Sequence, residues 1–246
     1  MIFPSAGDEL DLLGLAGAYA YPEDRWLRVN FVASADGSVS VDGVSGGLSS
    51  PGDKRVFGIL RVLADVVLVG SGTAHDEHYR PARARPALAS LREGRTAAAP
   101  IAVVTRTMRL DLASTLFTEA VPESRTIVIT CASSDEKLRA ATAEVADVIV
   151  AGEDTVDLPA AVDALADRGL RRVLCEGGPH LFGDLAAAGL VDELCLSLSP
   201  VLAGPGAGRI IAGQQSPARP LALHQAVADE GFLFLRYFAQ EQAKDQ

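Results

Sequence analysis

The stretch at residues 171–189 constrains the fold more than any other part of the sequence. It reads Arg-Arg-Val-Leu-Cys-Glu-Gly-Gly-Pro-His-Leu-Phe-Gly-Asp-Leu-Ala-Ala-Ala-Gly. The apolar residues at 173–175 predict a short buried strand, and the apolar spacing after Pro179 predicts a helix. Pro179 suits the first turn of that helix, where its missing N–H costs no hydrogen bond. A strand that passes directly into a helix in this way is typical of α/β proteins.

Gly177 and Gly178 lie at the junction between this strand and this helix. Glycine lets another group approach the backbone closely, and the free N–H groups of a helix start attract phosphate. Glu176 precedes the glycines at the carboxyl end of the strand, where open α/β sheets bind their ligands. The residues alone leave two interpretations, a plain strand–turn–helix corner and a phosphate-binding corner.

Composition narrows the class of protein. The chain has 246 residues, of which 48% are hydrophobic, and its formal net charge is −10. No apolar run reaches the ~18 residues that a membrane span requires, and the N-terminus has acidic residues where a signal peptide needs basic ones. The three widely spaced cysteines predict reduced core residues and no metal site. We therefore expect a cytoplasmic protein that binds neither a membrane nor nucleic acid.

Five arginines between residues 80 and 95 are the one basic cluster that could oppose this conclusion. They alternate with prolines and alanines, and we interpret them as a solvated loop. The cluster comprises Arg80, Arg83, Arg85, Arg92 and Arg95.

Strand and helix signals alternate along most of the chain. Strands are predicted at 26–34, 65–69, 101–104, 126–130, 148–150, 173–175, 194–198, 221–227 and 232–238. Helices are predicted at 8–20, from a Ser50 cap through 63, at 134–144, at 157–168 and after Pro179. The pattern predicts one α/β domain, residues 1–246, with a largely parallel sheet of about nine strands and an antiparallel C-terminal hairpin.

Residues 70–73 predict a tight turn that contacts a ligand at the carboxyl end of a central strand. They read Gly-Ser-Gly-Thr, but His75 occupies the third glycine position of a dinucleotide fingerprint, so that motif fails. Gly43, Gly46 and Gly47 make residues 39–49 a second flexible or ligand-contacting loop.

Four segments together resemble a known family. Residues 29–37, Arg61 with 64–73, residues 175–179 and residues 190–194 are similar to the reductase domain of bacterial riboflavin biosynthesis. The resemblance extends over 26–238 and is closest to the stand-alone pyrimidine reductase-like proteins of actinobacteria. It implies a dihydrofolate reductase-like three-layer αβα fold. It also implies NADPH-dependent reduction of 5-amino-6-(5-phosphoribosylamino)uracil to the ribitylamino form.

The same resemblance implies roles for individual residues. Asp36 and Glu77 are expected near the nicotinamide and substrate as catalytic residues. The substrate-binding residues implied are Ser45, Arg61, Arg83 and Glu176, with the two arginines on the sugar phosphate. The cofactor-binding residues implied are Gly70, Ser71, Gly72, Thr73, Thr105, Arg106, Thr107, Gly177, Gly178, Pro179, His180, Leu181 and Phe182. Arg106 is expected to meet the 2′-phosphate and so to select NADPH over NADH.

Further expectations follow from the resemblance. The zinc-binding motifs of the deaminase domain found in bifunctional relatives are absent, so we expect neither deamination nor a metal. The family suggests a homodimer, with Leu194, Leu196 and Leu198 as an apolar contact edge.

Three departures from the family pattern lie at the substrate end. Ser38 replaces a frequent lysine, Gly47 lies where the bifunctional enzymes have an aromatic residue, and His78-Tyr79 replaces Asn-Pro. Two alternatives therefore stay open, a pterin reductase such as a dihydrofolate reductase and a non-catalytic NADPH-binding protein.

Overall fold

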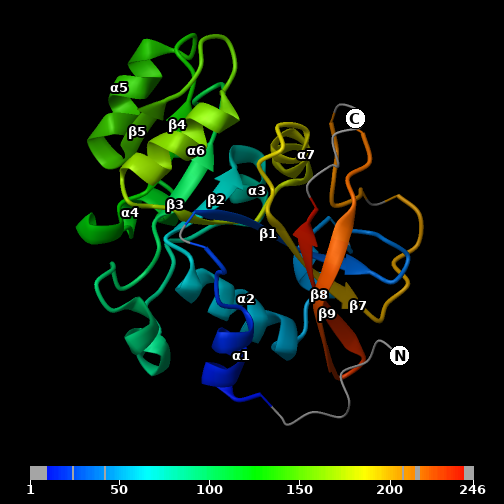
Figure 1. Ribbon diagram of the computed structural model, residues 1–246. Helices are drawn as coiled ribbons and strands as arrows, with labels where there is room; N and C mark the ends of the chain where they lie inside the picture. Colours follow the sequence, from blue (N-terminus) through cyan, green and yellow to red (C-terminus); the bar gives the residue numbers. More distant parts are fainter. Residues whose placement is uncertain (1–9, 24, 42, 207, 214–216, 241–246) are drawn as a thin grey trace, which may run out of the picture.

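The computed structural model describes residues 10–23, 25–41, 43–206, 208–213 and 217–240. The strands of this part form one nine-stranded sheet in the order β5-β4-β3-β2-β6-β1-β7-β9-β8 (Figure 1). They are β1 (Trp26–Ser34), β2 (Val66–Gly70), β3 (Ile101–Val104), β4 (Ile127–Thr130), β5 (Asp147–Val150), β6 (Arg172–Cys175), β7 (Glu193–Ser199), β8 (Leu221–Asp229) and β9 (Phe232–Ala239). Strands β1 to β7 pair in parallel, whereas β9 pairs antiparallel with β7 and with β8. The predicted sheet is confirmed.

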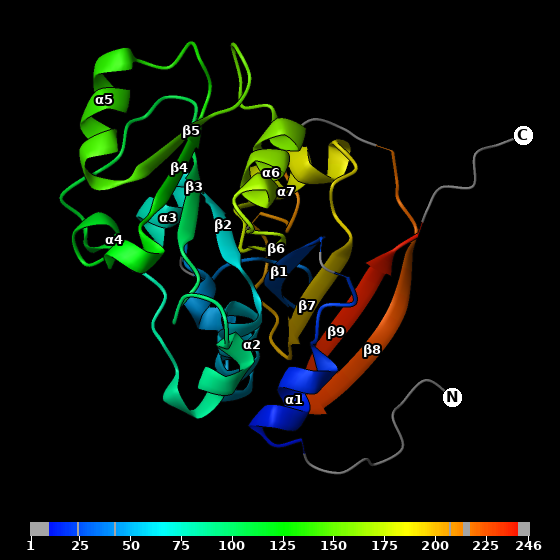
Figure 2. The ribbon, with the colours of Figure 1, turned by 60° about the vertical axis from the view of Figure 1, so that its left-hand side comes forward.

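Helices cover both faces of this sheet (Figure 2). The α-helices are α1 (Leu12–Ala18), α2 (Pro51–Leu63), α3 (Ser71–Asp76), α4 (Thr115–Thr118), α5 (Glu136–Val145), α6 (Leu158–Asp167) and α7 (Pro179–Ala187). Short 3-10 helices are η1 (Ser45–Leu48), η2 (Pro86–Arg92) and η3 (Pro122–Ser124). Apolar side chains of α1 and α2 form one core with the sheet, and those of α6 and α7 form the other. The result is the predicted three-layer αβα architecture.

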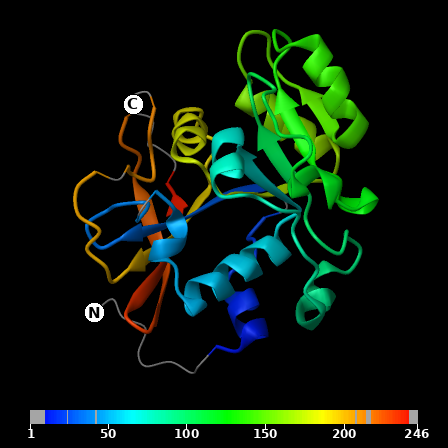
Figure 3. The same cartoon turned by 180° about the vertical axis from the view of Figure 1, so that it is seen from behind.

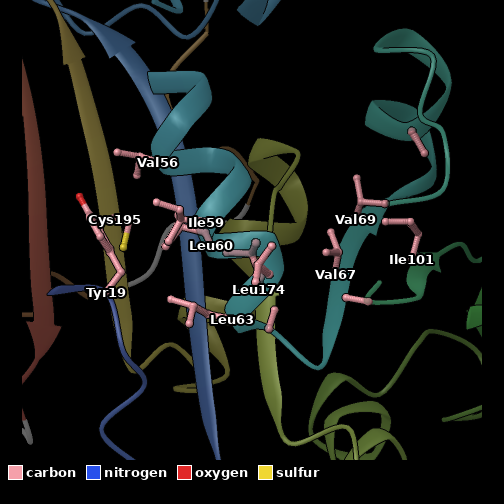
Figure 4. Close-up of a cluster of buried hydrophobic side chains, with 14 of the residues drawn as sticks. Tyr19, Val56, Ile59, Leu60, Leu63, Val67, Val69, Ile101, Leu174 and Cys195 are labelled. Atoms are coloured by element: carbon pink, nitrogen blue, oxygen red, sulfur yellow. The ribbon is translucent and has the colours of Figure 1, made fainter. Parts of the chain in front are cut away.

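Helix α2 is held firmly, because its start is capped and one of its faces is buried. The Ser50 hydroxyl accepts a hydrogen bond from the backbone N–H of Asp53 at 3.1 Å, as the predicted cap requires. Ile59 and Leu60 are completely buried against the sheet, in the same apolar cluster as Val67 and Leu174 (Figure 4). This packing fixes the rotation of α2 about its own axis, and so sets which of its residues face away from the sheet.

The arginine-rich segment is not simply a solvated loop, and that interpretation is wrong for two of its members. Arg92 is 5% exposed and donates to the carbonyl oxygens of Val62 and Ala64 at 2.8 and 2.7 Å. Arg95 donates to the same helix end and to Asp65. The two side chains satisfy the free carbonyls at the C-terminus of α2, a role that needs neither solvent nor nucleic acid.

A buried charged cluster lies at the amino end of β1 and β7, away from the carboxyl ends of the parallel strands. Glu193 on β7 accepts hydrogen bonds from Arg28 on β1 at 2.8 Å and from Arg236 on β9 at 2.6 Å. Arg236 also donates to the carbonyls of Ala18 and Ala20, so the cluster anchors the end of α1 to the sheet.

Two sequence-based predictions are corrected by the chain path. Residues 70–73 do not form a tight turn, because α3 begins at Ser71 directly after β2. A helix of six residues is too short to show apolar periodicity in a sequence. Leu194, Leu196 and Leu198 do not form a free edge, because both edges of β7 are hydrogen-bonded, to β1 and to β9.

Candidate active site

A cleft of about 710 Å³ extends along α2, from the carboxyl ends of β2 and β6 to residues 97–99 before β3. Helices α2 and α3, which contribute to its walls, lie at the front of the view in Figure 3. Further walls come from residues 30–32 of β1, the glycine-containing loop before η1, residues 76–85 and the β6–α7 corner. Ligands of α/β proteins bind at this edge, so the cleft is the candidate active site.

Arg61, Glu176 and Tyr79 form a hydrogen-bonded group in the cleft. Arg61 donates from Nε to Oε1 of Glu176 and from Nη2 to Oε2, both at 2.7 Å. The Tyr79 hydroxyl donates to Oε2, also at 2.7 Å. The Glu176 side chain is 2% exposed and that of Arg61 is 22% exposed. The structure thus brings two predicted substrate-binding residues together, but as partners of each other.

Aromatic rings surround the Arg61 guanidinium. Its central carbon lies 4.5 Å from the ring centroid of Phe57 and 5.4 Å from that of Tyr79, distances that allow cation–π attraction. Burial, with the negative charge of Glu176 as the next cause, raises the pKa of the Tyr79 hydroxyl well above its ordinary value. Tyr79 therefore stays protonated and donates. No role was predicted for Tyr79 from the sequence. The one sequence feature that pointed to it was the replacement of Asn-Pro by His78-Tyr79.

The cleft is more positive than the protein as a whole. Its lining includes six lysines and arginines against four aspartates and glutamates, in a chain of net charge −10. Arg80, Arg83 and Arg85 line it with exposed side chains. The Arg85 guanidinium lies against α2 at Gly58, where an added Cβ would be 2.1 Å from Nη2. The absence of a side chain at Gly58 makes room for Arg85, which the sequence analysis did not assign.

Glu77 and Ser45 meet in the cleft, whereas Asp36 does not line it. Glu77 Oε1 accepts a hydrogen bond from the backbone N–H of Ser45 at 3.1 Å, which ties the glycine-containing loop to the end of α3. Asp36 accepts from the Ser34 hydroxyl and from the N–H groups of residues 203 and 204. These hydrogen bonds, of which the one from Ser34 has the largest effect, lower the pKa of Asp36 to about 2. Asp36 therefore holds a loop, and the geometry lends its predicted catalytic role no support.

The glycine corner is packed against two neighbouring elements. Gly177 has φ +93°, and an added Cβ would lie 2.7 Å from Phe31 Cζ. A Cβ on Gly178 would lie 2.3 Å from Thr73 Oγ1, and a cis peptide joins the two glycines. Gly178 is the N-cap of α7 and no side chain caps that helix, so its first N–H groups are available to an anion.

The remaining cofactor-binding candidates divide into exposed and buried side chains. His180 is exposed, but Leu181 and Phe182 are buried in the core at 7% and 4% exposure. The predicted contact of these two residues with the cofactor therefore stays a prediction that concerns their backbone and not their side chains. Thr105 is also buried, and its hydroxyl accepts from the N–H of Met108. Arg106 is exposed just beyond the carboxyl end of β3, and so is the neighbouring Thr107.

The described residues contain neither a metal-binding cluster nor a membrane-spanning helix. No group of three or more histidine, cysteine, aspartate or glutamate side chains is arranged to hold a metal ion. No helix in the same part of the chain has the length and apolar character to cross a membrane.

Comparisons with known proteins point to one family. Residues 25–230 match the model of the RibD C-terminal domain family. A 2,5-diamino-6-ribosylamino-4(3H)-pyrimidinone 5′-phosphate reductase of Archaeoglobus fulgidus is 31% identical over 73% of this chain and 82% of its own length. A crystal structure of a pyrimidine reductase-like protein from Corynebacterium diphtheriae superposes with a TM-score of 0.80 at 27% identity, covering 89% of this chain and 93% of that one. The riboflavin biosynthesis reductase of Saccharomyces cerevisiae shares the fold, with a TM-score of 0.64 at 17% identity over 91% and 94% of the two chains.

Proposed function

Because the chain belongs to the RibD C-terminal domain family, we propose that it is an NADPH-dependent reductase of riboflavin biosynthesis that reduces a phosphorylated ribosylaminopyrimidine. The observation that carries the proposal is the cationic cleft at the carboxyl edge of the sheet, in a chain that is otherwise strongly acidic. Such a cleft attracts an anionic substrate.

The glycine corner fits a dinucleotide. An uncapped helix start binds phosphate through its N–H groups, and α7 has no side-chain cap. Gly72 leaves the backbone of α3 open to approach, since no heavy atom lies within 4 Å of its Cβ position, whereas Thr73 fills the space beside Gly178. The Arg106 guanidinium, exposed beyond β3, would select the 2′-phosphate. NADPH supplies the hydride when bound, and the protein orients the reactants and excludes water.

The substrate phosphate is assigned to arginines other than Arg61. The Arg61 guanidinium is already paired with Glu176 in two hydrogen bonds, whereas Arg83 and Arg85 extend exposed side chains along the cleft. A doubly charged group in a cleft requires more than one such partner. We therefore propose Arg83 and Arg85 as the phosphate ligands, and Arg61 and Glu176 as a unit that contacts the rest of the substrate.

Steady-state oxidation of NADPH with three substrates tests the proposal. The first is 5-amino-6-(5-phosphoribosylamino)uracil, which the sequence resemblance implies. The second is the 2,5-diamino compound for which the Archaeoglobus fulgidus relative is named. The third is dihydrofolate, included because the buried Glu176 carboxylate resembles the acceptor that a pterin reductase needs. Turnover of either pyrimidine supports the proposal, turnover of dihydrofolate alone replaces it, and NADPH binding without turnover identifies a non-catalytic relative.

The phosphate ligands are tested by removing the phosphate or its partners. Arg83→Ala and Arg85→Ala should each raise KM for the pyrimidine by about tenfold or more, with NADPH affinity preserved. Their effects should be non-additive, because both act on one group. If the dephosphorylated pyrimidine is reduced as efficiently as the phosphorylated one, the phosphate site does not exist.

We also propose a homodimer, formed through a sheet face and not through an edge. Leu194, Leu196 and Leu198 alternate along β7 on one face of the sheet, where Leu194 is buried in the core with α6 and α7 but Leu196 and Leu198 are only partly buried. Leu235 on β9 lies opposite Leu196 and is also partly buried. These partly exposed leucines form an apolar face that favours a covering partner. Light scattering should show a dimer at micromolar concentration and a monomer for Leu235→Glu; a monomeric parent protein contradicts the proposal.

A further inference from the structure

The hydrogen bonds around Glu176 leave its two oxygens in different states. Oε2 accepts from Arg61 Nη2 and from the Tyr79 hydroxyl, whereas Oε1 accepts from Arg61 Nε. A carboxylate has about four acceptor sites, two on each oxygen. Among the described residues, protein donors therefore fill both sites of Oε2 and one site of Oε1. Because Glu176 lines the cleft, the remaining site on Oε1 is the one available to a bound molecule.

We infer that Tyr79 is a positioning residue for the substrate: its hydroxyl occupies Oε2 and thereby directs a substrate N–H or O–H donor to Oε1 of Glu176. The inference deepens the proposed function and rests on it, since it requires Glu176 to contact the substrate. Removal of the hydroxyl would free one acceptor site on Oε2. The carboxylate could then rotate, or bind the substrate donor at either oxygen, and the substrate would lose its single orientation.

Tyr79 is well placed for this role because its backbone and ring are both fixed. Its N–H donates to the carbonyl of Ala74 at 2.9 Å, which attaches it to α3. Its ring packs partly against the core and lies next to the Arg61 guanidinium. A rigid donor holds the carboxylate more narrowly than a water molecule could.

The test compares two conservative variants that each remove one phenol hydroxyl. Tyr79→Phe keeps the ring, its packing and its contact with Arg61. Tyr21→Phe is the matched control, because the Tyr21 hydroxyl donates to the carbonyl of Val173 at 3.5 Å at the opposite end of β6 from Glu176. KM for the pyrimidine, kcat, the Kd for NADPH and the melting temperature are measured for both variants and for the parent protein.

We expect Tyr79→Phe to lower kcat by roughly tenfold, because part of the bound substrate is then held out of line with the reacting groups. Its KM and its Kd for NADPH should change by less than about twofold, because the substrate donor still finds an acceptor on Glu176. Tyr21→Phe should leave kcat and KM unchanged. An unchanged kcat in a folded Tyr79→Phe, or a loss in kcat matched by an equal weakening of NADPH binding, overturns the positioning role while the proposed function stands. A parent protein that reduces neither pyrimidine overturns both.

Discussion

Replacement of Arg61 separates a structural role from a substrate-binding role. In Arg61→Ala, the Glu176 carboxylate keeps the Tyr79 hydroxyl but loses both hydrogen bonds from the guanidinium. Removal of one partner from a fully buried ion pair costs about 3–5 kcal/mol. The Arg61 side chain is 22% exposed and faces the cleft, so water can reach the vacated position. We therefore expect the smaller loss of about 2–3 kcal/mol in the free energy of unfolding.

The assay is thermal unfolding followed by circular dichroism, in the absence of substrate. For a chain of this size each kcal/mol lowers the melting temperature by about 2–4 °C, so Arg61→Ala should melt about 4–12 °C below the parent protein. The double variant Arg61→Ala/Glu176→Gln removes the unpaired charge and should recover part of the loss. Arg80→Ala serves as the control, because Arg80 lines the same cleft with an exposed side chain and should change stability by no more than about 0.5 kcal/mol.

The refuting result is equally specific. Arg61→Ala would melt no more than about 1 °C below the parent protein, while its KM for the phosphorylated pyrimidine would rise far more than that of Arg83→Ala. That result would show that Arg61 is primarily a substrate ligand and not a structural partner of Glu176. A double variant that is less stable than Arg61→Ala would also contradict the reasoning, because the cost would then not come from an unpaired Glu176.

Three further predictions concern the cofactor and the buried charges. Arg106→Ala should narrow the preference for NADPH over NADH by about 1–3 kcal/mol, and fluorescence titration showing equal affinities in the parent protein would refute this. Gly178→Val should abolish NADPH binding, since its Cβ would lie 2.3 Å from Thr73 Oγ1 and would displace this predicted cofactor-binding residue; normal binding by a folded variant would make the corner purely structural. Burial alone would raise the pKa of Glu193, but its two arginine partners outweigh burial and lower it. The stability that this group contributes is therefore complete above its unfolded pKa of about 4.3 and is lost as pH falls toward the folded value. Urea denaturation between pH 5 and pH 3, a window set by that pKa, should show a steeper loss for the parent protein than for Glu193→Gln.

Local features of the sequence determine most of the secondary structure. The strands from β1 to β9 and helices α2, α6 and α7 each have an apolar pattern long enough to be recognised, and Ser50 and Pro179 mark two helix starts correctly. The glycine corner is also visible in the sequence, because a strand, two glycines and a helix are contiguous there. Short elements such as α3 cannot be recognised from the sequence, since six residues contain too little apolar periodicity.

Only the tertiary structure decides which side chains meet. Arg61 and Glu176 are 115 positions apart, and nothing local distinguishes an arginine that binds a phosphate from one that is neutralised by a buried carboxylate. The position of β7 is decided in the same way, because its alternating leucines would look alike on an edge strand or between β1 and β9. The physical reason is common to both cases. Hydrogen bonds and ion pairs depend on distance in space, and that distance is set by how the strands order themselves in the sheet, which no local pattern encodes.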